Sequence, residues 1–316
     1  MHWSHVLAAT VLTGTLLLGL PAGCQPASDA APGTSAEPSG ATLSLSDSVL
    51  TPPDTTAARF AVAWATARAY HDDGQSTGAL MQNIGRYFEG RPYFTGTLDA
   101  PPRETLVVRF DGFDCVTFVE TTLALARSAE AADSTYAGFA RRLAEQRYRD
   151  GGPVGYCTRL HYFTEWLTDN ANRGLVRLLG DDLGGRPLRD ALDFMSTHRS
   201  AYDRFATNDS LFACVQAMEN RLQKQQRATP VRYVPQDSIR AVYEQLQGGD
   251  IVALVSSIDG LDVAHTGLVY AHDDGGRGLL HASLSDGVVV SPDLQRYVEK
   301  IDGQVGMVVA RPQSVR

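Results

Sequence analysis

The chain has 316 residues, 43% of them hydrophobic, and carries a formal net charge of −8 with a sequence pI near 5.5. This apolar content is enough for a buried core, which excludes a short peptide or a disordered tail. The acidic balance, and the lack of a run of Lys or Arg in the sequence, argue against nucleic acid or an anionic membrane surface as the main partner.

The N-terminus has the pattern of an export signal. Residues 6–20 form an apolar run that is too short and too close to the terminus for a membrane span. The segment LPAGCQ that follows resembles the lipobox of bacterial lipoproteins, in which the cysteine becomes the acylated N-terminus. We therefore predict a lipoprotein-type signal peptide over residues 1–23, a lipid anchor on Cys24 that attaches the protein to a membrane, and an exported location in the periplasm or cell envelope. A plain secreted protein is the alternative.

Residues 24–57 are rich in Ala, Ser, Thr, Pro and Asp and contain few large apolar side chains. Such a segment cannot bury enough surface to fold, so we predict a flexible linker. Periodic apolar residues begin at Phe60 and continue to the C-terminus without a second linker or an internal repeat. We therefore predict one domain over residues 58–316.

Helical periodicity dominates the first half of this domain, and short β-rich runs separated by Asp/Gly turns follow from Asp250. The predicted helices are Ala58–His71, Gly78–Phe88, Cys115–Ala129, Thr135–Tyr148, Leu160–Asn170, Leu211–Gln225 and Ser238–Leu246. The predicted strands are DIVALVSS (250–257), AHTGLVYA (264–271), GLLHASLS (278–285), GVVVSP (287–292) and VGMVVARP (305–312). Together they predict an α+β fold, in which a helical half packs on an antiparallel meander.

A cysteine stands at the predicted start of one helix, in the stretch RFDGFDCVTFVETTLALA (109–126). Asp114 is a good N-cap, and the apolar stripe of Val116, Val119 and Leu123 has helical spacing, so Cys115 falls in the first turn. There the unpaired N–H groups and the helix dipole favour the thiolate that a nucleophile requires. The competing interpretation is a small buried core thiol.

A cysteine hydrolase also needs a histidine that moves the proton and a third group that orients the imidazole. Two histidines lie in the predicted signal peptide, and three lie at polar helix ends or in a turn. The remaining candidates are His161, His265 and His281. A hairpin centred on Asp273 or Asp274 would put His265 and His281 on one face, and centring on Asp274 makes them diagonal neighbours. Without Cys115, two half-buried strand histidines would be the simpler interpretation.

With these residues in view, the chain resembles the NlpC-type cell-wall hydrolases, which are papain-like cysteine peptidases and amidases. The resemblance is carried by GRPYFTG (90–96), FDC (113–115), GGD (248–250), HTG (265–267) and HAS (281–283), all in family order. It implies a papain-like fold with Cys115 as nucleophile, His265 as base, His281 as the residue that orients it, and Tyr93 near the oxyanion site. The family's usual DCSG is DCVT here.

The segments DCVTFVE (114–120) and RLHYFTEW (159–166) resemble the subgroup of N-acetylmuramoyl-L-alanine amidase-like proteins known as domain of unknown function 1460. That subgroup implies cleavage of the amide between the muramyl lactyl group and L-alanine, on peptidoglycan fragments (muropeptides). The alternatives are a stem-peptide endopeptidase of the same fold and a non-catalytic wall-binding lipoprotein. We expect no cofactor; zinc is disfavoured because the sequence has no H-E-x-x-H motif and its histidines cluster with a thiol.

The predicted helix that contains RLHYFTEW buries Leu160, Phe163 and Leu167 in its simplest interpretation. Its other faces carry Arg159 and Tyr162, which we predict as substrate contacts, and pair His161 with Glu165 four residues later. Two cysteines remain after Cys24 and Cys115 have been assigned. In an oxidising compartment Cys157 and Cys214 are available for a disulfide, and a buried core thiol at Cys214 is the alternative.

Overall fold

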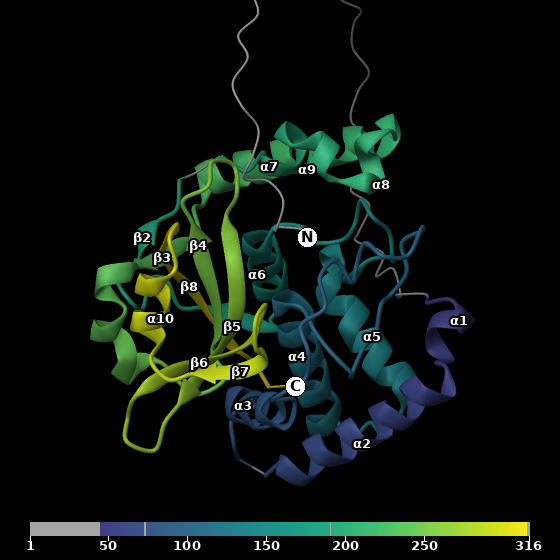
Figure 1. The fold of residues 1–316 in the computed structure, drawn as a ribbon, viewed down its shortest axis with the longest axis vertical. Coiled ribbons are helices and arrows are strands. Elements are labelled where there is room, and N and C mark those ends of the chain that lie inside the picture. Colours follow the sequence, from purple (N-terminus) through teal and green to yellow (C-terminus); the bar gives the residue numbers. More distant parts are fainter. Residues whose placement is uncertain (1–44, 73, 190, 315–316) are drawn as a thin grey trace, which may run out of the picture.

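The computed structural model describes residues 45–72, 74–189 and 191–314, and Figure 1 shows their arrangement. The predicted signal peptide and Cys24 lie outside the described residues. Within those ranges, every helix is too short or too polar to cross a lipid bilayer.

Helices form the first half of the described chain. They are α1 (Asp47–Leu50), α2 (Asp54–Tyr70), α3 (Thr77–Tyr87), α4 (Cys115–Glu130), α5 (Tyr136–Arg147) and α6 (Phe163–Asn172). The bounds of α3, α4 and α5 confirm the predicted helices to within one residue. Helix α4 is central, because it packs against α2, α3, α5 and strand β5 (Val263–Ala271), and nearly all of its residues from Thr117 onward are buried.

The predicted linker is wrong at its C-terminal end. Helix α1 and the first turn of α2 lie within residues 45–57, and Leu45 is buried in the main core. Val49 and Leu50 pack against the same core, where α1 contacts α5. These few apolar side chains, isolated in a polar segment, are enough to dock it because α5 offers a surface already formed.

Eight strands form one antiparallel sheet. The remaining strands are β1 (Val176–Leu178), β2 (Arg186–Pro187), β3 (Arg232–Pro235), β4 (Ile251–Ser256), β6 (Arg277–Ser283), β7 (Gly287–Ser291) and β8 (Gln304–Pro312). Their order is β2-β3-β8-β4-β5-β6-β7, with β1 also paired to β8. The meander from β4 to β7 is confirmed, and β8 returns after helix α10 (Leu294–Lys300) to pair with the free edge of β4.

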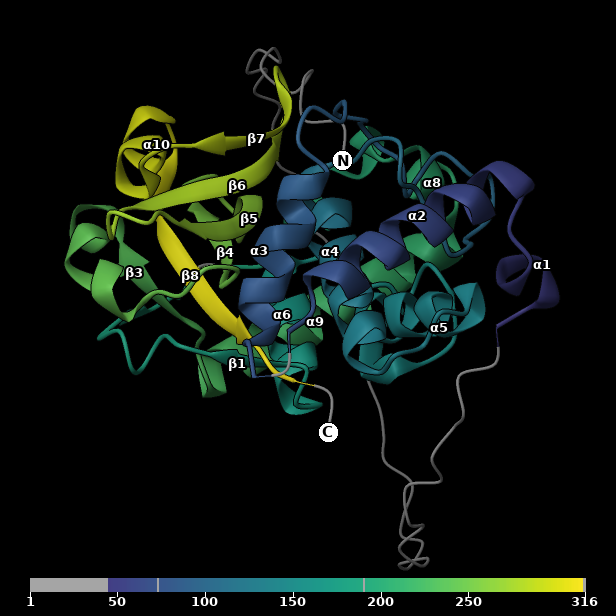
Figure 2. The same cartoon turned by 90° about the horizontal axis from the view of Figure 1, so that it is seen from below.

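The sheet separates two cores, as Figures 1 and 2 show by the position of α3 and α4 on one side and α10 on the other. Every residue of β4 is buried, and its side chains alternate. Ile251, Ala253 and Val255 belong to the helical core, whereas Val252 and Leu254 belong to the core under α10. This burial on both faces explains the continuous apolar run of the strand.

The predicted helix at Ser238–Leu246 is wrong. The segment forms two short 3₁₀ turns, η3 (Gln236–Ser238) and η4 (Arg240–Gln245). They pack Val242 and Tyr243 onto the core under α10. The space between α10 and the sheet edge favours compact turns over a regular helix.

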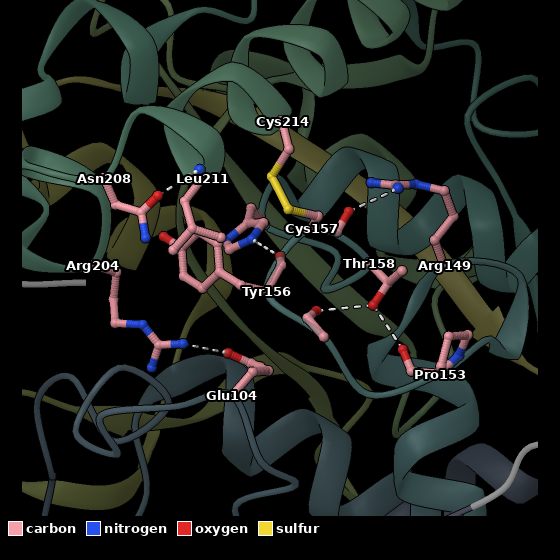
Figure 3. Close-up of a disulfide and its surroundings, with 12 residues drawn as sticks. Glu104, Arg149, Pro153, Tyr156, Cys157, Thr158, Arg204, Asn208, Leu211 and Cys214 are labelled. Atoms are coloured by element: carbon pink, nitrogen blue, oxygen red, sulfur yellow. Dashed lines mark hydrogen bonds and ion pairs between the residues drawn. A yellow bond between two sulfur atoms is a disulfide. The ribbon is translucent and has the colours of Figure 1, made fainter.

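A third cluster lies where helices α7 (Phe194–Thr197), α8 (Asp203–Ala206) and α9 (Asp209–Ala228) cross one end of the molecule. A disulfide between Cys157 and Cys214 joins the loop before α6 to α9, which decides the alternative that the sequence left open (Figure 3). Tyr156, next to Cys157, contacts the rings of His161 and Phe205. The bridge therefore ties α9 to the loop that packs around Tyr156.

We predict that replacing both bridged cysteines, Cys157→Ser with Cys214→Ser, lowers the free energy of unfolding by about 4 kcal/mol, because the bridge closes a loop of 57 residues in the unfolded chain. Denaturant unfolding without reductant measures the difference, and adding reductant to the unsubstituted protein should give the same loss. Thiol counting on denatured, unreduced protein truncated after Cys24 should find one free thiol, and three would contradict the bridge.

Candidate active site

A cavity of about 470 Å³ lies where the start of α4 meets β5. Four of the residues predicted from the sequence line it: Tyr93, Cys115, Arg159 and His265. His281 is buried behind His265, and Tyr162 is absent from the lining. The fold thus brings most of the predicted site to one cavity.

Cys115 is the first residue of α4, and Asp114 caps the helix as predicted. The Asp114 side chain accepts from the Thr117 N–H at 2.7 Å, and the Thr117 hydroxyl reaches back to the Asp114 N–H, which completes a capping box. The backbone N–H groups of Thr266 and Val116 lie near the Cys115 sulfur and lower the pKa of its thiol. The nucleophile candidate is therefore held between its own helix and strand β5.

The expectation of a resting thiolate is wrong. Burial, and then the adjacent Asp114 carboxylate, raise the pKa of the Cys115 thiol to about 12, although the N–H groups of Thr266 and Val116 lower it. The helix start supplies the expected donors, but the loss of water outweighs them. In the free protein Cys115 is a neutral thiol.

The two sheet histidines form a hydrogen-bonded pair. Strands β5 and β6 pair Leu268 with Leu280 and Ala271 with Arg277, so the hairpin is centred on Asp274 and the histidines are diagonal neighbours. Nε2 of His265 lies 2.8 Å from Nδ1 of His281, and the rings are nearly perpendicular at 88°. Of the two registers that the sequence left open, the structure has the one centred on Asp274.

Gly267 makes this pair possible. It lies beneath His281, and a Cβ atom built on it would stand 2.8 Å from the His281 Cβ and 2.8 Å from the Leu280 carbonyl oxygen. Real Cβ atoms do not approach so closely, so any side chain at this position would displace β6 and the imidazole. The glycine of the HTG motif is explained by this contact.

Two neighbours of the histidines were missed from the sequence. The Ser291 hydroxyl, at the end of β7, lies 3.1 Å from Nε2 of His281. The ring of Tyr297, on α10, contacts both imidazoles, with centroids 4.7 Å from that of His281 and 6.1 Å from that of His265. The parity rule that pairs the histidines also finds Ser291, because β6 pairs Leu279 with Ser291 and makes it diagonal to His281. No comparable local pattern points to Tyr297.

These contacts define how a proton could move. If the Nε2–H of His265 donates to His281 and the Nε2–H of His281 donates to Ser291, the Nδ1 of His265 keeps its lone pair. That Nδ1 has no hydrogen bond among the described residues, so its lone pair is available to accept a proton. Burial, and then the neighbouring His281, lower the pKa of His265 to about 3, and burial lowers the pKa of His281 to about 4. Both imidazoles are neutral at pH 7.

Tyr93 lies beside the nucleophile. A parallel bridge with Phe113 holds it next to the start of α4, and its hydroxyl is near enough to Cys115 for that residue to shift the tyrosine pKa. Burial is the largest cause that raises the pKa of Tyr93, so the phenol keeps its proton. A phenolic O–H beside the backbone N–H at a helix start can stabilise an oxyanion.

The prediction that Tyr162 contacts substrate is wrong. Its side chain is 1% exposed, and its hydroxyl donates to Glu219 at 2.7 Å and accepts the Met195 N–H at 3.2 Å. The predicted helix begins three residues late, at Phe163. The reason is that Arg159 lies in a β-bridge with Tyr148, and the Leu160 N–H donates to the Arg147 carbonyl instead of entering a helix.

Arg159 reaches the cavity from this extended segment. Its guanidinium pairs with Asp99, donates to the Leu98 carbonyl oxygen at 2.9 Å, and lies over the ring of Tyr156. Whether it contacts substrate stays a prediction.

The predicted pairing of His161 with Glu165 is wrong. Nε2 of His161 lies 2.7 Å from the Tyr156 carbonyl oxygen, while Glu165 pairs with Arg149 and Arg221. Burial, and then the charge of Arg159, lower the pKa of His161 to about 3. His161 lines the cavity as a neutral ring. Across the described residues, no group of three or more His, Cys, Asp or Glu side chains has the spacing of a metal site.

Comparison with known proteins decides the family. The model of the AmiA-like family, described as N-acetylmuramoyl-L-alanine amidase-like, matches residues 83–307. The chain belongs to this amidase-like family. The match spans every residue of the site, from Tyr93 to Gln304. A comparison with curated proteins found no match.

Several solved structures share the fold of this chain. An N-acetylmuramoyl-L-alanine amidase from Bacteroides uniformis is 30% identical, with a TM-score of 0.69 over 75% of this chain and 99% of that one. A Bacteroides fragilis protein is 32% identical, with a TM-score of 0.63 over 72% of this chain and 98% of that one. Its structure was named as that of a xylanase, as a provisional assignment. A Legionella pneumophila protein assigned to domain of unknown function 1460 shares the fold at 19% identity, with a TM-score of 0.60 over 83% of this chain and 97% of that one.

We predict that the kcat/KM of this amidase-like protein shows no inflection near pH 6.5, the ordinary imidazole value. A base must be neutral to accept a proton, and burial lowers the pKa of His265 to about 3, so activity is lost only as the pH falls toward that value. A pH profile measures this, with circular dichroism at each pH to exclude unfolding. An acid limb centred near 6.5 would contradict the buried, neutral base.

Proposed function

We propose that the protein is a cysteine-dependent peptidoglycan amidase that hydrolyses the N-acetylmuramoyl-L-alanine amide bond of muropeptides. The observation that carries the proposal is the meeting of Cys115, at a capped helix start, with the hydrogen-bonded pair of His265 and His281 at one cavity. Membership of the amidase-like family supports the choice of an amide bond, and the name of the Bacteroides uniformis relative supports the choice of this amide.

The geometry supports a sequence of steps that starts from neutral groups. The Cys115 sulfur attacks the lactyl carbonyl carbon while its proton passes to Nδ1 of His265. His281 holds the resulting imidazolium through its Nδ1, and Ser291 holds His281. The oxygen of the tetrahedral intermediate would be stabilised by the Tyr93 hydroxyl and the Cys115 N–H.

The intermediate then breaks its C–N bond. His265 returns the proton to the departing amine of L-alanine, and the lactyl carbonyl remains on Cys115 as a thioester. Water, activated by the same imidazole, hydrolyses the thioester and restores the thiol. We also propose that the acylated Cys24 anchors the enzyme in the cell envelope, where peptidoglycan fragments arise.

We predict that Cys115→Ala abolishes hydrolysis and leaves the fold intact, because the thiol supplies chemistry more than packing. His265→Ala should reduce kcat by about 10² to 10⁴, and His281→Asn should be milder because an amide can still orient the ring. His272→Ala is the matched control, since this histidine lies in the β5–β6 turn and bonds the Pro292 carbonyl. An active Cys115→Ala protein would contradict the cysteine mechanism. A larger loss of kcat at His281 than at His265 would show that His281 is the base and His265 the residue that orients it.

We predict that digestion of a defined disaccharide muropeptide releases the free disaccharide and an intact peptide that begins with L-alanine. Only cleavage at the lactyl amide gives this pair of products. Mass spectrometry of the digest distinguishes them. Products cut between two amino acids would make the protein a stem-peptide endopeptidase, and intact substrate would favour a non-catalytic wall-binding protein.

A further inference from the structure

Helix α10, the start of β8 and the turn between them form one wall of the cavity. Tyr297, Ile301 and Gln304 all line it, and Tyr297 also packs against both catalytic imidazoles. Gln304 begins β8, where its backbone pairs with Ser256 of β4 and its N–H donates to the Ile301 carbonyl oxygen. The position of Gln304 is therefore fixed by the sheet, in the lining of the cavity that also contains Cys115 and His265.

The side chain of Gln304 is 6% exposed, and its Oε1 atom is buried without a hydrogen-bond partner among the described residues. A buried acceptor that lacks a donor destabilises a fold, so it calls for an explanation. Asp262, another polar residue of the lining, already has hydrogen-bond donors within the protein. Its carboxylate oxygens accept from the Thr164 N–H and hydroxyl and from the Val263 N–H. The Gln304 amide keeps its capacity to accept a hydrogen.

We propose that Gln304 determines specificity by accepting an amide N–H of the substrate through Oε1. The inference rests on the proposed function, since muropeptides carry secondary amides both in the 2-acetamido group of the sugar and along the stem peptide. The donor must be an amide N–H that enters the same cavity as the scissile bond, because Gln304 lines this cavity together with Cys115 and His265. A bound substrate would supply the donor that the free protein lacks.

Gln304→Met tests the proposal, because methionine has nearly the same shape and lacks the acceptor. We expect KM for a disaccharide muropeptide to rise about tenfold with kcat nearly unchanged, and the melting temperature to stay level or to rise because an unpaired acceptor is removed. The matched control is Gln295→Met on α10, whose amide already bonds Arg240 and Glu299 and which should lower stability slightly without changing KM.

Two modified substrates distinguish the source of the N–H. If the donor is the acetamido group, the wild type should lose about tenfold in kcat/KM on a substrate whose sugar amine is deacetylated, and Gln304→Met should lose little more. If the donor is a stem-peptide amide, N-methylation of the peptide should show the same pattern instead. Equal losses in both proteins for both substrates, or a destabilised Gln304→Met protein with unchanged KM, would overturn the proposal.

Binding separates this inference from the proposed function. The uncleaved muropeptide should bind Cys115→Ala protein about tenfold more tightly than Cys115→Ala protein that also carries Gln304→Met, measured by calorimetry. That result together with cleavage of a different bond by the wild type would support the role of Gln304 and overturn the proposed bond choice. Equal binding by the two proteins would overturn the role of Gln304 even where the wild type cleaves the lactyl amide.

Discussion

The close approach of the first turn of α4 to strand β5 determines the rest of the site. Helix α4 is buried along its length, and inside the protein the Glu120 carboxylate pairs with the Arg147 guanidinium at 2.7 Å and accepts the Trp166 indole N–H at 3.2 Å. Removing one partner of such a pair leaves an uncompensated buried charge, so the contact strongly favours one placement of the helix. On the sheet side, the Thr266 hydroxyl bonds the Val252 carbonyl at 2.7 Å. The helix and strand meet as two fixed surfaces.

That rigidity has an electrostatic consequence. Closing the helix onto the sheet excludes water from Cys115 and His265, and the charged form of each group is destabilised for the same reason. In the proposed mechanism the acid and the base are therefore both neutral at rest, in contrast to a preformed thiolate and imidazolium. Charge would develop only during attack, with Tyr93 and the Cys115 N–H already beside the sulfur. Preorganised donors of this kind act without further rearrangement.

Local rules in the sequence predicted much of this arrangement. An N-cap followed by an apolar stripe located Cys115 at a helix start, and the alternation of strand faces paired His265 with His281, because both rules depend on near neighbours in the chain. The surroundings of Arg159 were mispredicted because its partner Asp99 is 60 residues away and the backbone pairing with Arg147 competes with helix formation. Gln304 was missed for a similar reason, since only the return of β8 beside β4 brings it to the cavity.

The cavity has two walls of independent origin. Cys115 and His265 come from the junction of α4 and the sheet, whereas Tyr156 lies next to the bridge from Cys157 to α9, and Tyr202 packs on Phe205 in the cluster beneath it. The wall that contains Tyr156 packs on a separate small core, and this core includes no residue of the strands that carry His265 and His281. Sequence change in that wall can thus reshape what the protein accepts without disturbing how it reacts. Homologues could diverge in substrate range by this route, and a laboratory library confined to the loops and α9 would follow it.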